Sequence, residues 1–166
     1  MPELTESQEN TLALFVAGAD RLEAILQDLP EEALDSACAP GEWTIRHIVH
    51  HLADDCDVWS MCIKKAVATP GVLVRFEGFP GNEPWADGLA FGCRGVEPAK
   101  TLLQAHRRYI THLATHFSDA WDRSFKLGNA QGEVVREFSV REIIEMLTDH
   151  MSEHVAVIEE ILEQKG

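Results

Sequence analysis

His150 and His154 lie four residues apart in a segment whose apolar residues recur every three or four positions. Residues with this spacing share one face of an α-helix, so both imidazoles can point to the same place. At about 100° per residue, His154 lies within about 35° of the centre of the apolar face, and His150 lies about 75° from it. Imidazole is a preferred ligand of divalent transition metals, so the pair indicates a metal site. Hydrogen-bonded core histidines are the alternative interpretation.

A second group of histidines, at positions 47, 50 and 51, supplies candidates for a third ligand. By the same arithmetic, His51 lies about 110° from the centre of its apolar face, whereas His47 and His50 lie about 150° away. His51 is therefore the member expected to face the interior most. His47 and His51 are themselves four residues apart, which leaves a chelate within this segment as a competing hypothesis.

Asp55 follows His51 by one helical turn and lies about 70° from the centre of the apolar face. It could orient a metal ligand or act as a general base, and a solvated acidic residue is the alternative interpretation. The late histidine pair has the spacing of the zinc-protease motif His-Glu-x-x-His, but Met151 stands where that motif has its general base. Proteolysis is therefore not expected.

The remaining histidines and the cysteines are interpreted mainly as structural. His106 lies near the middle of another apolar stripe, where a core histidine is favoured over a donor to a metal ligand. The four cysteines include no Cys-x-x-Cys pair, and Cys56 falls on a buried face as a small core residue. A cysteine nucleophile is not expected.

The candidate ligands lie on helices whose starts are marked by capping residues. Thr5 and Ser139 begin capping boxes, Thr44 is a candidate N-cap, and Pro98 suits a first helical turn. The apolar stripes that follow predict four helices, over residues 5–29, 44–67, 98–117 and 139–162. The expected fold is therefore all-α, a four-helix bundle.

A long connection separates the second and third predicted helices. Its 29 residues, 69–97, can span the roughly 36 Å of a helix of about 24 residues, so these two helices are expected to run parallel. Phe79, Trp85 and Phe91 in this connection either wall a pocket above the metal or pin the segment to the bundle. Residues 72–76 and 133–138 could form a short hairpin, and no other segment indicates a β-strand.

Composition limits the class of protein. The chain has 166 residues, and 14 Lys and Arg against 28 Asp and Glu give a net charge of −14, so one domain, 1–166, is expected. The negative charge disfavours nucleic acid and anionic membranes as partners, and no apolar run approaches the roughly 20 residues of a membrane span. The acidic start, and a chain length that needs no disulfide framework, lead us to expect a cytoplasmic protein.

The segment 41–54, Gly-Glu-Trp-Thr-Ile-Arg-His-Ile-Val-His-His-Leu-Ala-Asp, followed by His150-x-x-x-His154, resembles the DinB/YfiT-like superfamily of metalloenzymes. It is most similar to the YfiT branch, which contains bacillithiol S-transferases and has been described as metal-dependent hydrolases. The resemblance implies an up-down-down-up bundle in which one histidine of the second helix and two of the fourth bind a divalent metal. Carried over to this sequence, the ligands are His51, His150 and His154.

This chain departs from the YfiT branch directly after the shared motif, where Asp55-Cys56 replaces Ser-His. The resemblance therefore implies the fold and the metal site but leaves the substrate open. The expected function is a divalent-metal-dependent low-molecular-weight-thiol S-transferase, with zinc or nickel as the metal and a small-molecule substrate. A metal-dependent hydrolase and a non-catalytic, stress-related binding protein are the alternatives, and a homodimer is compatible with the helical faces.

Overall fold

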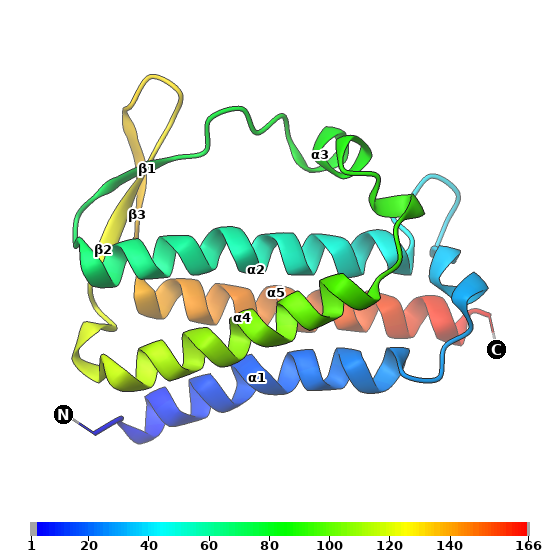
Figure 1. Ribbon diagram of the computed structural model, residues 1–166, viewed down its shortest axis with the longest axis horizontal. Coiled ribbons are helices and arrows are strands. Elements are labelled where there is room, and N and C mark those ends of the chain that lie inside the picture. Colours follow the sequence, from blue (N-terminus) through cyan, green and yellow to red (C-terminus); the bar gives the residue numbers. More distant parts are fainter. Residues whose placement is uncertain (1–2, 166) are drawn as a thin grey trace.

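The computed structural model describes residues 3–165, most of which lie in a bundle of four long helices (Figure 1). These helices are α1 (Glu6–Leu26), α2 (Ile45–Ala68), α4 (Glu97–His116) and α5 (Val140–Glu163). Figure 1 shows α1 and α5 running in one direction along the bundle and α2 and α4 running in the opposite direction. The predicted four-helix bundle is confirmed.

Side-chain caps fix the helix starts as the sequence indicates. Thr5 and Ser139 each form a complete capping box, and the Thr44 hydroxyl accepts from the backbone N–H of His47. The first helix ends at Leu26, three residues earlier than predicted, and Pro30 further along disfavours helical backbone at Leu29. A short 3₁₀ helix, η1 (Glu31–Asp35), follows and leads to α2.

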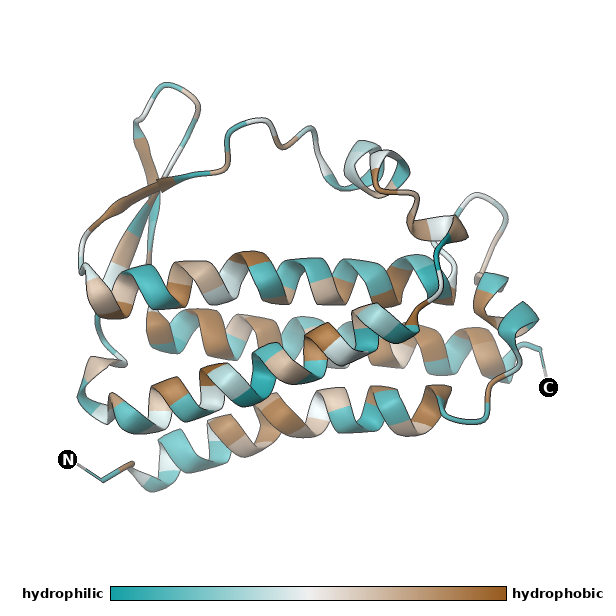
Figure 2. Ribbon diagram, in the orientation of Figure 1, coloured by the Kyte–Doolittle hydropathy of each residue, from teal (hydrophilic) through white to brown (hydrophobic). Residues whose placement is uncertain are grey.

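The helices bury two clusters of apolar side chains, one at each end of the bundle. Phe15, Ile63 and Ile143 belong to the cluster at the end that carries the strands, and Leu22, Ile48 and Ile158 belong to the other. Figure 2 shows hydrophobic and hydrophilic residues alternating around each helix, as a shared core requires. On α5 the two clusters meet between Leu147 and Met151, next to the late histidine pair.

A three-stranded sheet at one end of the bundle corrects the expectation of an all-α fold. β2 (Ser124–Gly128) lies in the middle, pairing in parallel with β1 (Leu73–Arg75) and in antiparallel with β3 (Val134–Ser139). The predicted hairpin of residues 72–76 with 133–138 is therefore wrong: both segments contain strands, but β2 separates them. β2 has only five residues, too few for alternation to be visible in the sequence.

The connection between α2 and α4 runs back along the bundle, from the sheet to the opposite end (Figure 1). It contains β1, a short helix α3 (Asn82–Gly88) and a single 3₁₀ turn, η2 (Phe91–Cys93). This crossover lets α2 and α4 run in the same direction. Within residues 3–165, no helix is long and apolar enough to cross a membrane.

Candidate metal centre

Three histidine side chains from two helices converge at one point beside the core. His51 comes from α2, and His150 and His154 come from successive turns of α5. The Nε2 atom of His150 lies 3.3 Å from Nε2 of His51 and 3.0 Å from Nε2 of His154. One ring nitrogen from each of the three lies within 4.8 Å of the others, and this is the one such histidine-containing group in the described part of the chain.

The spacing of these nitrogens fits a bound cation. Nitrogen ligands about 2.0–2.1 Å from a tetrahedral zinc ion lie about 3.3–3.4 Å from one another, close to the two observed separations. Hydrogen bonds among the three rings cannot account for both short separations at once. A neutral ring nitrogen carries either one N–H or one lone pair, so Nε2 of His150 can bond to only one of its two neighbours. A cation would instead accept the lone pairs of all three rings.

The surroundings keep the imidazoles in the neutral form that binds metals. Burial, together with the nearby His150, lowers the pKa of His51 to about 4. The same two causes, with a smaller effect of His51, lower the pKa of His154 to about 4. Trp43 and the His51 ring pack edge to face, with the ring centroids 4.9 Å apart, and this contact helps to fix the orientation of His51.

Asp55 faces the same point from the next turn of α2. Its Oδ2 atom lies 3.5 Å from Nδ1 of His150 and 3.7 Å from Nε2 of His51. These separations are longer than hydrogen bonds, but they place the carboxylate against two of the three rings rather than in open solvent. Burial raises the pKa of the Asp55 carboxyl.

A cavity of about 490 Å³ opens beside His51 and Asp55, between α2 and the crossover. The aromatic residues Phe79, Trp85 and Phe91 all line it, as does Trp59 of α2. The crossover aromatics were predicted either to wall a pocket or to pin the segment, and they do both. The Trp85 indole N–H donates to Asp54 of α2, while Phe91 is buried. The volume lies in the range of small-molecule sites.

The model of the DinB superfamily matches residues 14–158 of this chain. The chain belongs to the DinB superfamily. The resemblance stated from the sequence motif is thereby confirmed.

This DinB chain is similar to two other proteins. It is 29% identical over 101 residues to the protein OB0782 of Oceanobacillus iheyensis, which is named, provisionally, as a metal-dependent hydrolase. That match covers 60% of this chain and 56% of the relative, little more than half of its length. Over the whole chain and 92% of the other, the fold matches YfiT of Bacillus subtilis with a TM-score of 0.83 and 18% identity. YfiT is described as a probable metal-dependent hydrolase with an unusual four-helix bundle topology, and at this identity the likeness establishes the fold alone.

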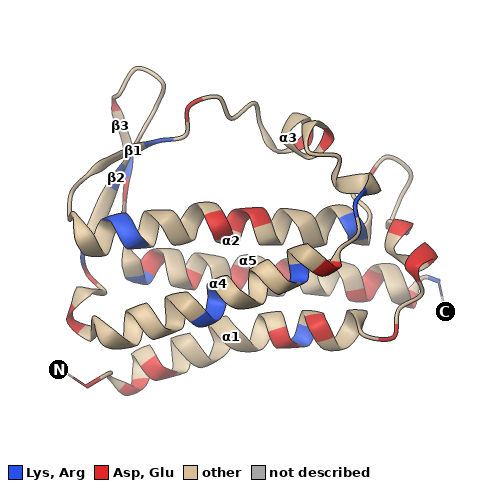
Figure 3. Cartoon of the chain, in the orientation of Figure 1, with Lys and Arg blue, Asp and Glu red and all other residues tan. Residues whose placement is uncertain are grey.

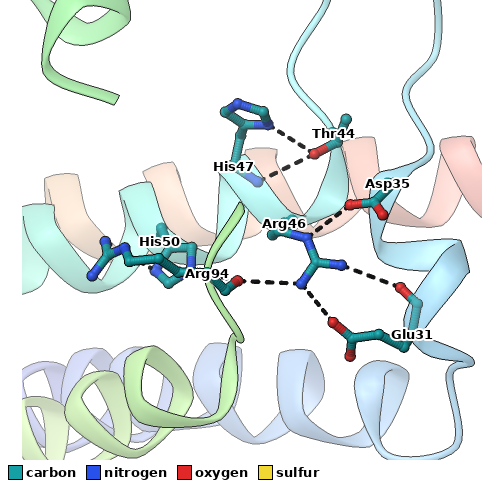
Figure 4. A network of polar contacts seen from close by, with 7 residues as sticks. All are labelled: Glu31, Asp35, Thr44, Arg46, His47, His50 and Arg94. Carbon is teal, nitrogen blue, oxygen red and sulfur yellow. Dashed lines mark hydrogen bonds and ion pairs between the residues drawn. The ribbon is translucent and has the colours of Figure 1, made fainter. Parts of the chain in front are cut away.

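Within the motif of residues 41–54 in this DinB chain, Arg46 takes part in a polar network rather than in the candidate metal centre (Figure 4). Arg46 is buried and donates to carboxylates of Glu31 and Asp35, each at 2.7 Å, and to the carbonyl oxygen of Arg94 at 3.2 Å. The hydrogen bond from Arg46 lowers the pKa of Asp35. One guanidinium thus ties η1, the start of α2 and the crossover together. Charge and position in the sequence give no sign of this role.

The position of His50 on α2 predicts an outward direction, but the side chain is buried. It is buried because the crossover covers that face of α2. The His50 ring stacks on Phe91 with centroids 5.4 Å apart, and its Nε2 lies 3.3 Å from the carbonyl oxygen of Arg94. Burial lowers the pKa of His50.

The competing chelate of His47 with His51 is not formed. Nδ1 of His47 lies 2.8 Å from the Thr44 hydroxyl, and the other edge of its ring faces Gly92. A Cβ atom at position 92 would stand 2.7 Å from Cε1 of His47, so only glycine lets the crossover approach so closely. His47 therefore supports the helix start and the crossover.

The other predicted residues lie away from the centre. His106 is half-buried, and its Nε2 lies 3.0 Å from a carboxylate oxygen of Asp57. It is thus a boundary residue with a polar partner rather than a core residue. Cys56 and Cys62 are buried, and burial raises the pKa of both thiols, to about 11 for Cys62, which keeps them protonated and unreactive at neutral pH.

Proposed function

We propose that this chain is a divalent-metal-dependent enzyme that acts on a small molecule, with His51, His150 and His154 as the metal ligands. The observation that carries the proposal is the convergence of three Nε2 atoms beside a cavity of about 490 Å³. All three donors are imidazole nitrogens, which favours zinc or nickel over magnesium. Three protein ligands leave a coordination position open, as in catalytic zinc sites and unlike closed structural ones.

The chemistry of such a centre follows from the donor set and its neighbours. A divalent ion held there would lower the pKa of a water or thiol that enters the open position. Asp55 has two possible tasks. Its Oδ2 lies 3.5 Å from Nδ1 of His150, from where it can hold that ring's orientation, and it can also accept a proton from the entering molecule.

Hydrolysis is the reaction that the similar proteins support, since OB0782 is named, provisionally, as a metal-dependent hydrolase and YfiT is described as a probable one. Transfer of a low-molecular-weight thiol to an electrophile is the second candidate, supported by the resemblance of residues 41–54 to the YfiT branch. Both reactions use the same open position. A cytoplasmic site of action and association as a homodimer are further parts of the proposal, the first supported by four free cysteines.

A substrate panel tests this function. The zinc-loaded and nickel-loaded proteins are assayed with nitrophenyl esters and amides, and with bacillithiol, mycothiol or glutathione plus monochlorobimane. We expect turnover that His154→Ala abolishes and that His112→Ala, an exposed histidine of α4, leaves unchanged. Turnover of esters or amides alone identifies a hydrolase, and turnover with a thiol alone identifies a transferase. Metal binding without turnover of either kind would contradict the proposal in favour of a binding protein.

The role of Asp55 is tested by Asp55→Asn, which keeps the size of the side chain. If Asp55 accepts a proton in the reaction, kcat should fall about a hundredfold or more while the metal content stays the same. Asp57→Asn removes a charge from the same helix outside the cavity and serves as the control. Equal activity of the two variants would show that Asp55 takes no part in the chemistry.

A further inference from the structure

The cavity beside the metal centre is walled by two pairs of aromatic rings. Trp59 of α2 meets Phe76 edge to face, with ring centroids 5.7 Å apart. Phe79 and Trp85, both in the crossover, contact each other at the same centroid separation. Phe76, Phe79 and Trp85 are each more than a third exposed, although large apolar side chains are normally covered. Exposed rings on both walls of a cavity suit an apolar ligand of aromatic size.

The charged groups of this cavity are mostly carboxylates. Arg75 is its one basic residue, and its guanidinium pairs with Glu77 at 2.6 Å, so the two charges cancel. Asp55 is turned toward the histidines. Asp54 accepts a hydrogen bond from the Trp85 indole, which is a neutral donor, and no ion pair among residues 3–165 includes Asp54. A negative charge without a cation therefore lies next to an aromatic ring.

We propose that this cavity binds a substrate with two parts, an apolar part of aromatic size and a positively charged group. Asp54 is the counter-ion of the charged group, and the crossover rings pack around the molecule. Aromatic faces attract cations, and they do so most strongly where water is partly excluded. The net charge of −14 and the acidic residues in the middle of α2, visible in Figure 3, also favour cations over anions near this face. The reaction at the histidines rests on the proposed function, but this binding preference does not.

The proposal also orients the substrate. A divalent ion at the three histidines would repel a cationic group, and Asp54 attracts that group toward α3, whose Trp85 it contacts. The uncharged part of the molecule, with the bond to be broken or attacked, is thereby left on the side of His51 and Asp55. An anionic substrate would meet the negative charge of Asp54 along the same wall.

The test uses two ligands that share a ring and differ in charge, naphthylmethyl-trimethylammonium and naphthylmethanesulfonate. The quaternary nitrogen has no lone pair, so it cannot bind by ligating the metal. Dissociation constants for the metal-loaded protein are measured by titration calorimetry at low and high salt. We expect the ammonium compound to bind about tenfold more tightly, with a smaller preference at high salt, because one ion pair and one cation–π contact are at work.

Two matched variants distinguish the effect of Asp54 in the cavity from the effect of the overall negative charge of the molecule. Asp54→Asn removes the charge but keeps an oxygen that accepts from Trp85, and it should reduce the preference about threefold. Asp57→Asn makes the same charge change outside the cavity and should leave the preference unchanged. Equal or tighter binding of the sulfonate would overturn the proposal, as would equal effects of the two variants. Loss of the preference while metal-dependent turnover persists would refute only this inference, and a retained preference without turnover would refute only the proposed function.

Discussion

His150 is the residue on which the metal centre depends most, because its Nε2 atom contacts the ring nitrogens of both His51 and His154. Purified protein should carry about one divalent ion per chain, measured by inductively coupled plasma mass spectrometry. Combined His150→Ala and His154→Ala substitution should remove it, because one imidazole cannot hold the ion alone. His47→Ala is the control, since His47 belongs to the same histidine-rich segment but bonds to Thr44. Full metal content in the double variant would refute the ligand assignment.

The lowered pKa values of His51 and His154 predict how the metal-free protein responds to acid. Both groups have a pKa of about 4 in the folded state, against about 6.5 in an unfolded chain, so the unfolded state binds more protons between these values. The free energy of unfolding should therefore fall as the pH decreases from about 6.5 toward 4. Urea denaturation of chelated protein at several pH values measures this slope.

A matched pair of variants tests whether this pH dependence of the free energy of unfolding comes from the histidines of the metal centre. His154→Asn removes one of the two groups and should make the pH dependence shallower between about pH 6.5 and 4. His112→Asn removes an exposed histidine and should leave it unchanged. The same slope in both variants would mean that His154 stays as accessible to protons as a free imidazole.

At the scale of elements, the crossover is held to the bundle by Arg46. Its buried guanidinium bonds to η1 and to the backbone before α4, so Arg46→Ala would leave several charged hydrogen bonds unmade. We expect a loss of about 2 kcal/mol or more in the free energy of unfolding, measured by denaturant titration. Arg21→Ala breaks a pair with Glu159 in which the arginine side chain is 60% exposed, and should cost less than about 1 kcal/mol. Similar losses in both variants would show that burial of Arg46 adds nothing.

At the scale of the whole molecule, the bundle should fold without its metal. Two apolar clusters fill its length, so metal binding is not the main source of folding free energy, unlike in small zinc domains. An ion that binds only the folded state still adds about 2.7 kcal/mol when its free concentration is a hundredfold above the dissociation constant. For a chain of this size, chelation should lower Tm by about 5–10 °C and leave the helical circular dichroism in place. Loss of helicity on chelation would indicate a structural metal instead.

Sequence alone determined the features that depend on neighbouring residues. Caps at Thr5, Thr44 and Ser139 and the spacing of apolar residues specify the helices, because both act within one or two turns. The pairing of His150 with His154 is local for the same reason. His51 could be added to them only weakly from its direction, and firmly only through the resemblance of its motif to a known family.

Tertiary structure decided what depends on segments far apart in the chain. β2 becomes a strand because β1 and β3 lie on either side of it, which five residues cannot reveal by themselves. His50 is buried by a crossover more than 40 residues away, so an outward position on α2 did not mean exposure. The cavity exists only where the crossover aromatics face Asp54 and Trp59 of α2. Local spacing gives the direction of a side chain on its own helix, and only long-range packing determines what meets it there.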